Sequence, residues 1–97
     1  MVSEDLLQSW ERTEKLLKIA SSFLSPTVVK QQENALLEMA EFLEHNELGL
    51  AFDWLKSIAQ ECQWDSVELL EALVLAAENM GRIDDADRLR QRILELA

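Results

Sequence analysis

His45 and Cys62 have the widest chemical use of the side chains in this sequence, and each residue type occurs once. His45 follows Glu41 by one helical turn, so the two side chains could supply two metal ligands. They lack the repeated Glu-x-x-His pattern with which helical bundles hold paired metal ions. Cys62 falls on an apolar helix face, where the reactive thiolate is disfavoured. We therefore expect no catalytic residue, no metal and no cofactor, and we do not expect an enzyme.

Carboxylates are the most abundant functional groups in the sequence. Nineteen acidic and nine basic residues give a net charge of −10. The excess lies in residues 31–81, where eleven acids accompany a single base, Lys56. Such a segment repels nucleic acid and anionic membranes and attracts a basic partner. Solubility of a small helical protein is the other explanation for it.

Four of these acids recur at a three-residue step: Glu38, Glu41, Glu44 and Glu47. Neighbours at that spacing lie close together on a helix, where like charges destabilise it by roughly 0.2–0.5 kcal/mol per pair. No Lys or Arg is interleaved to relieve the repulsion. The row is therefore either a solvated helix face or a negative ridge that binds Lys and Arg side chains of a partner.

The overall composition indicates which elements position these groups. Ninety-seven residues, 48% of them apolar, contain only two Gly and one Pro. The sequence therefore predicts a single all-α domain over residues 1–97, with little room for a deep active site. The lone Cys cannot form an internal disulfide, and no apolar run approaches the roughly 20 residues of a membrane span. The first residues carry acids where a signal peptide carries bases, so we expect the protein in the cytoplasm.

Start and stop signals predict five helices, over approximately residues 3–24, 26–45, 48–61, 65–80 and 84–97. Pro26 begins the second helix, and Asn46 and Gly81 end the second and fourth in the left-handed conformation. Asp65 and Asp84 are the predicted caps of the last two helices. The positions expected to face inward include Leu6, Ala40 and Leu96. Short connections favour a compact antiparallel bundle of four to five helices.

Trp54 is set apart from the apolar face of the predicted helix 48–61. The apolar residues of that helix share one arc: Leu48, Ala51, Phe52, Leu55, Ile58, Ala59 and Cys62. At 100° per residue, Trp54 lies roughly 100° from the centre of the arc. Trp54 is therefore either a core residue at the margin of the helix or an anchor for an interface.

The charge row and this aromatic position together define the predicted partner-binding residues. We expect these side chains on one continuous anionic face: Glu41, Glu44, Glu47, Asp53, Trp54, Asp65 and Glu68. The partner would be a basic protein domain, bound in a salt-sensitive way. The alternative is a helical adaptor or structural module that self-associates, for example as a homodimer, through Leu37, Leu50 and Trp54.

Residues 45–55, His-Asn-Glu-Leu-Gly-Leu-Ala-Phe-Asp-Trp-Leu, resemble the central segment of small acidic immunity proteins of the MafI and contact-dependent growth inhibition type. In that family a helix ends, a Glu-aliphatic/aromatic-Gly-Leu-Ala run follows, and a second amphipathic helix begins. The resemblance implies a non-enzymatic cytoplasmic protein that binds and neutralises the toxic C-terminal domain of a bacterial toxin, commonly a nuclease. A nuclease surface attracts phosphate and is therefore basic, which suits an acidic inhibitor. The family pattern identifies no contact residues, and we expect Gly49 and Ala51 to serve close helix packing.

Overall fold

The computed structural model describes residues 4–61 and 66–96. Within these residues the chain forms six helices and no strand. The helices are α1 (Glu4–Ser22), α2 (Pro26–Gln31), α3 (Glu33–Glu44), α4 (Leu48–Glu61), α5 (Val67–Asn79) and α6 (Ile83–Leu96). The predicted all-α fold class is confirmed.

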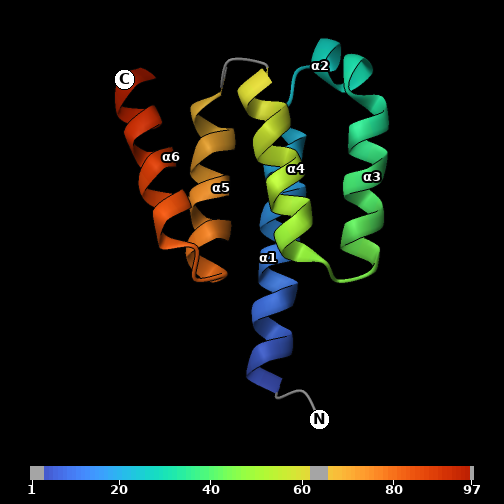
Figure 1. The fold of residues 1–97 in the computed structure, drawn as a ribbon, viewed down its shortest axis with the longest axis vertical. Coiled ribbons are helices and arrows are strands. Elements are labelled where there is room, and N and C mark those ends of the chain that lie inside the picture. Colours follow the sequence, from blue (N-terminus) through green and yellow to red (C-terminus); the bar gives the residue numbers. More distant parts are fainter. Residues whose placement is uncertain (1–3, 62–65, 97) are drawn as a thin grey trace.

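Helices α3, α4, α5 and α6 lie side by side, and α1 packs behind α4 and α5 (Figure 1). Helices that follow one another in this row run antiparallel, as the short connections predicted. The molecule is thin, with extents of 41 × 29 × 16 Å. Helix α3 packs mainly on α4 at one edge, and α6 packs on α5 at the other. Each edge helix therefore has one packed side and one side that faces solvent.

A buried polar contact joins α1 to the end of α5. Thr13 interrupts the apolar seam of α1 and is 1% exposed. Asn79 donates from Nδ2 to Thr13 Oγ1 at 2.7 Å and to the Ser9 carbonyl oxygen at 2.8 Å. The Thr13 hydroxyl in turn donates to the Ser9 carbonyl oxygen at 3.1 Å. Because buried polar groups destabilise a fold unless they are hydrogen-bonded, this contact fixes how the two helices align.

The helix predicted over residues 26–45 is in fact two helices. Gln32, with φ −108° and ψ 25°, separates α2 from α3. Its backbone N–H still donates to the Val28 carbonyl at 2.8 Å. Its side-chain Nε2 donates to Glu61 Oε2 at the end of α4, at 3.0 Å. Neither Gly nor Pro marks this break. It lets the short α2 lie across the end of the bundle (Figure 1).

Asn46 and Gly81 end α3 and α5, as predicted. Both residues have positive φ values, 57° and 77° respectively. In each case the following residue donates its N–H to the carbonyl five residues back, at 2.8 Å. This hydrogen bond is part of a Schellman ending, which reverses the chain within a few residues. The two endings place α4 against α3 and α6 against α5.

The caps of the last two helices differ from the predicted ones. Ser66 caps α5, because its side chain accepts a hydrogen bond from the Leu69 N–H at 3.2 Å. The predicted cap, Asp65, lies outside the described residues. Helix α6 begins at Ile83, so Asp84 lies within its first turn instead of capping it. An acid in the first turn still interacts favourably with the helix dipole.

One cluster of apolar side chains forms the core of the described helices. Its largest fully buried members are Phe52, Leu17, Leu55, Ile58, Leu69, Leu70 and Leu73. The predicted apolar arc of α4 is confirmed for residues 48–59, whereas Cys62 lies outside the described residues.

Three residues predicted to face inward are exposed: Leu6, Ala40 and Leu96. Leu6 belongs to the first turn of α1, which extends beyond the other helices (Figure 1). Ala40 lies on the flank of α3, which is packed on one side, and Leu96 ends α6. None of the described helices combines the length and the apolar character that a bilayer crossing requires.

Candidate functional site

The outward side of α3 carries carboxylates that have no ion-pair partner among the described residues. Glu33, Leu37, Glu41 and Glu44, called the α3 edge below, are all exposed. Their spacing of four, four and three residues places them on one helix face. Leu37, within this row, is 60% exposed. None of the ion pairs in residues 4–61 and 66–96 includes a carboxylate of the α3 edge. Glu33 was not among the predicted contact residues, although its spacing from Leu37 and Glu41 places it on the same helix face.

Glu41 and Glu44 occupy positions that oppose the dipole of their own helix. Both lie in the last turn of α3, which contains no basic residue. The carboxyl end of a helix carries partial negative charge, so an acid there is unfavourable by about 0.3–1 kcal/mol. Glu38 is also exposed and adds repulsion at the three-residue step. These acids lower the stability of α3, so a stabilising role does not explain them.

Glu47 follows α3 and immediately precedes α4. Its carbonyl oxygen accepts a hydrogen bond from the Ala51 N–H at 3.1 Å, and its side chain is exposed. A carboxylate beside the amino end of a helix interacts favourably with the dipole. Glu47 therefore has a structural role at the start of α4, unlike Glu41 and Glu44.

Asp53 is neutralised by a cation from the turn before α6. Arg82 Nη1 lies 2.6 Å from Asp53 Oδ1 and 3.7 Å from Asp85 Oδ2. The Arg82 guanidinium also lies 5.4 Å from the centroid of the buried Phe52 ring, within the range of a cation–π interaction. Asp53 was predicted to bind a partner, but its carboxylate already forms an ion pair with Arg82.

Gly49 gives Arg82 the room to reach Asp53. A Cβ atom at position 49 would lie 2.7 Å from Arg82 Nη2. The close approach expected at Gly49 is thus made by a guanidinium group, whereas Ala51 is fully buried in the core. The sequence offered no signal for this contact, because the two residues belong to different helical hairpins.

Trp54 holds α3 against α4. It is half-buried, and its ring stacks on that of Phe42 with centroids 6.5 Å apart and an interplanar angle of 29°. Its remaining surface lines a shallow hollow on the outer side of α4, together with Leu50 and Glu61. Of the two roles left open for Trp54, packing is therefore the one that the contacts show.

The predicted partner-binding residues come from several elements of the fold. Glu41 and Glu44 lie on α3, whereas Asp53 and Trp54 lie on the outer side of α4. Glu68 is exposed on α5, which packs against α1, α4 and α6, and it accepts a hydrogen bond from Ser66 Oγ at 3.2 Å. Asp65 lies outside the described residues. The predicted residues are thus spread over three helices and the turn before α4, and within residues 4–61 and 66–96 Asp53 is the one acid among them that forms an ion pair.

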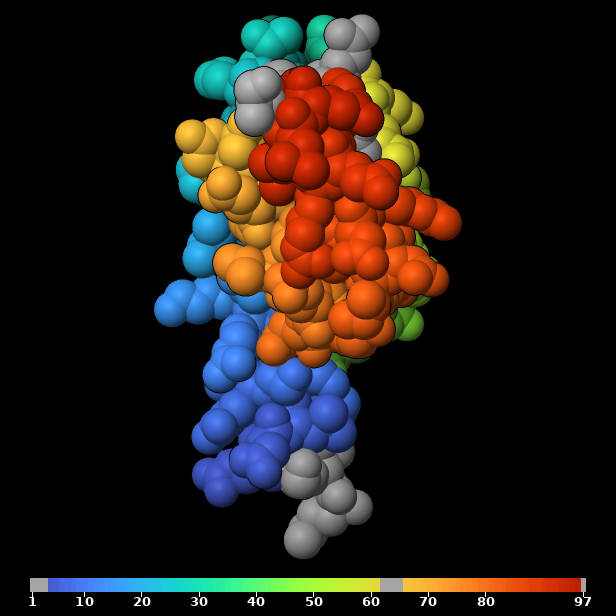
Figure 2. Space-filling view, turned by 90° about the vertical axis from the view of Figure 1, so that its left-hand side faces the viewer, coloured from blue at the N-terminus to red at the C-terminus, as the bar shows by residue number. Residues whose placement is uncertain are grey.

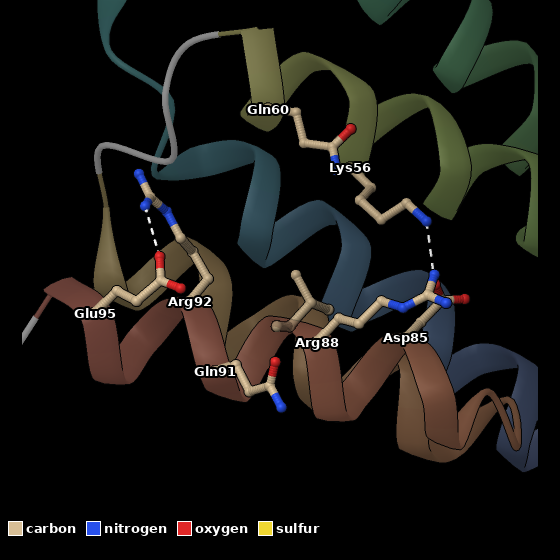
Figure 3. A pocket seen from close by; sticks show the side chains of 8 residues that line it. Lys56, Gln60, Asp85, Arg88, Gln91, Arg92 and Glu95 are labelled. Carbon is tan, nitrogen blue, oxygen red and sulfur yellow. Dashed lines mark hydrogen bonds and ion pairs between the residues drawn. The ribbon is translucent and has the colours of Figure 1, made fainter.

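The side formed by α4 and α6 is nearly balanced in charge. A cleft of about 270 Å³ lies between these helices (Figure 3). At one end Lys56 Nζ pairs with Asp85 Oδ1 at 3.1 Å. At the other end Arg92 Nη1 pairs with Glu95 Oε2 at 2.9 Å. Arg88 lies on the α6 wall between these two pairs. The bases of the tail are therefore largely used in pairs within the molecule.

His45 is exposed and caps the end of α3 through its backbone. In the part of the chain that the structure describes, no three His, Cys, Asp or Glu side chains are grouped so that they could hold a metal ion.

Residues 45–55, which carry the resemblance to immunity proteins, form the turn after α3 and the first half of α4. Their roles in the structure are a left-handed turn at Asn46, room for Arg82 at Gly49, and core packing by Phe52 and Leu55. Comparisons of the chain with protein-family models, with curated proteins and with solved structures gave no match.

Proposed function

We propose that this protein is a cytoplasmic immunity protein that binds a basic, nuclease-type toxin domain through the α3 edge and neutralises it. One chain would bind one toxin domain. The acidic composition and the resemblance of residues 45–55 to immunity proteins support this function. The α3 edge replaces the broader anionic face that the sequence suggested.

The observation that carries the proposal is the absence of ion-pair partners for Glu41 and Glu44 within the described residues. Both carboxylates oppose the dipole of α3, so the isolated protein is less stable because of them. Binding sites commonly keep residues that reduce stability, because those residues serve the partner. Lys and Arg side chains of a partner would supply the missing counter-charges.

The α3 edge offers a partner both charge and apolar surface. Glu33, Glu41 and Glu44 surround the exposed Leu37 on a helix that packs on one side only. The cationic groups with which a nuclease holds phosphates would pair with these carboxylates, so bound nucleic acid and this protein would exclude each other. The net charge of −10 would accelerate their encounter at low ionic strength.

The direct test uses the protein encoded immediately upstream of this chain. We expect a long secreted protein that ends in a small basic domain. That domain, purified and titrated with this protein, should lose its toxic activity at a one-to-one ratio, and the Kd should rise with salt concentration. An upstream product without such a domain, or a basic domain that neither binds nor is inhibited, would refute the proposal.

A matched pair of charge variants locates the contact. Glu41→Lys with Glu44→Lys should weaken binding about tenfold or more, because attraction at the α3 edge becomes repulsion. The control, Glu4→Lys with Glu11→Lys, makes the same change in net charge at two exposed positions of α1. Equal weakening by both variants would show that net charge acts instead of the α3 edge.

A self-associating adaptor is the second candidate function. Leu37 and Leu50 are 60% and 47% exposed, which favours it. Trp54, however, is engaged by Phe42, and the carboxylates around Leu37 would repel a second α3 edge. Loss of self-association in a Leu37→Arg variant would favour the adaptor over the inhibitor.

A further inference from the structure

A row of apolar side chains crosses the side of the molecule formed by α1, α5 and α6. Leu16, Ile19 and Phe23 recur at helical spacing along and just beyond α1, and the latter two are exposed. Leu75 is 53% exposed on α5, and Ile93 is half-buried on α6. These five residues are called the Leu75 face. Contacts of α5 with both α1 and α6 make the three helices neighbours, and Figure 2 shows α6 lying over α5 on this side.

Leu75 stands between two hollows of the surface. The hollow toward α1 has a volume of about 400 Å³ and includes Leu16. The hollow toward α6 has a volume of about 350 Å³ and is walled by Val74 and Ile93. Leu75 therefore protrudes from the surface beside a shallow apolar hollow, which could receive a protruding side chain of a second molecule. Contiguous exposed apolar side chains with a polar rim are typical of protein interaction sites.

The charged groups of the two hollows balance, unlike those of the chain as a whole. They are two bases and two acids: Arg12, Arg90, Glu71 and Glu78. Glu78 already pairs with Arg90, whose Nη2 lies 2.7 Å from Glu78 Oε2. A strongly basic partner would gain little on this side. Two copies of a chain with a net charge of −10 repel each other, and this repulsion is smallest for a contact at which the local charges cancel.

We infer that the Leu75 face is the contact surface of a homodimer, in which Leu75 of each copy enters the hollow between α5 and α6 of the other. A two-fold axis makes this contact reciprocal, because both copies present the same protruding leucine and the same hollow. Val74 and Ile93 of each copy are then covered by the leucine of the second copy. Helix α3 packs on α4, away from α5 and α6, so both α3 edges stay accessible in the dimer.

Two matched variants test the dimer by sedimentation velocity over a range of protein concentrations. Leu75 lies at helical spacing from Glu71 and Glu78, and Leu37 from Glu33 and Glu41. An arginine at either position can therefore pair with carboxylates of its own helix, so both variants should retain the helix content of the wild type. We expect a dimeric wild type, a monomeric Leu75→Arg variant and a dimeric Leu37→Arg variant.

Three results would overturn the inference: a wild type that is monomeric at all concentrations, a Leu75→Arg variant as dimeric as the wild type, or loss of the dimer in Leu37→Arg alone. If Leu75→Arg lowers the helix content in circular dichroism, Ile19→Arg makes the same change at the α1 part of the face. A monomeric Ile19→Arg variant would support the homodimer, and an Ile19→Arg variant as dimeric as the wild type would refute it. These measurements need no toxin, so their outcome is independent of the proposed function.

Discussion

Helices α3 and α6 occupy equivalent positions at opposite edges of the molecule (Figure 1), yet their charges are arranged differently. Helix α6 has Asp84 and Asp85 in its first turn, as the helix dipole favours, and Glu95 in its last turn is paired with Arg92. Helix α3 has Glu41 and Glu44 in its last turn, where the dipole opposes them. Two helices with similar packing thus differ in whether their charges assist folding.

The difference extends to the partners of these charges. Bases in and just before α6 pair with acids from the middle of the chain, as Arg82 does with Asp53 and Arg90 with Glu78. The carboxylates of α3 have no such partner in the described ranges. Helix α6 therefore completes the charge pattern of the fold, whereas α3 keeps its charges available to another molecule.

The largest expected effect on stability comes from truncating a buried leucine. Making this change on α3 and on α6 tests whether apolar packing stabilises both edge helices equally. Leu89→Ala on α6 and Leu43→Ala on α3 should each lower the free energy of unfolding by about 2–5 kcal/mol, since both leucines are buried. Urea denaturation measures both losses. Leu94→Ala, on an exposed part of α6, is the control and should change stability by less than about 0.5 kcal/mol. A loss confined to one edge would show that the two helices are not equivalent in packing.

The ion pairs of the α6 side should contribute less than its core. Arg82→Ala removes contacts with Asp53, Asp85 and the Phe52 ring, and should lower the free energy of unfolding by about 1–2 kcal/mol. Arg90→Ala is the comparison, because its two pairs are more exposed, and it should cost under about 1 kcal/mol. Equal, negligible losses in both variants would mean that the pairs on this side do not stabilise the fold.

The sequence predicted those parts of the fold that local chemistry determines. Pro26 fixes its own φ, and Asn46 and Gly81 tolerate the left-handed conformation, so the helix ends that they mark were found. The break at Gln32 was missed because the side chain of Gln32 is hydrogen-bonded to Glu61 on another helix, and local sequence does not reveal such a contact. Helical spacing found the core face of α4 but not the exposure of Ala40, which depends on how few helices cover α3.

The candidate site was predictable to the same extent. Spacing alone placed Glu41 and Glu44 on an outward helix face. It could not show that Asp53 is bound by Arg82, because the two residues are 29 positions apart in the chain and meet only when two hairpins pack. For the same reason the stacking of Trp54 on Phe42 and the contact of Arg82 with Gly49 appear only in the folded structure.

Charge reversal should change the free energy of unfolding in opposite directions at the two edges. Glu41→Lys with Glu44→Lys should raise the free energy of unfolding by about 1 kcal/mol, because cations suit the end of α3 and repulsion with Glu38 disappears. Asp84→Lys with Asp87→Lys in the first half of α6 should lower it by about 1 kcal/mol. Thermal and urea denaturation at low salt measure both changes, and added salt should shrink them. The contrast between the helices would be lost if both reversals had the same sign.

The smallest effect concerns the glycine that admits Arg82. Gly49 lies in α4 without a positive φ, so alanine suits its backbone and by helix propensity would stabilise the protein by up to about 1 kcal/mol. The new Cβ would displace the Arg82 guanidinium, whose Nη2 would be 2.7 Å away, and weaken its pair with Asp53. We therefore expect a net change within about 0.5 kcal/mol for Gly49→Ala in the wild type. In the Arg82→Ala background the same substitution should stabilise by at least about 0.5 kcal/mol more, and this difference is the coupling between the two residues. A double-mutant cycle by urea denaturation measures it, and equal effects in both backgrounds would show that Gly49 plays no part in the ion pairing of the α6 side.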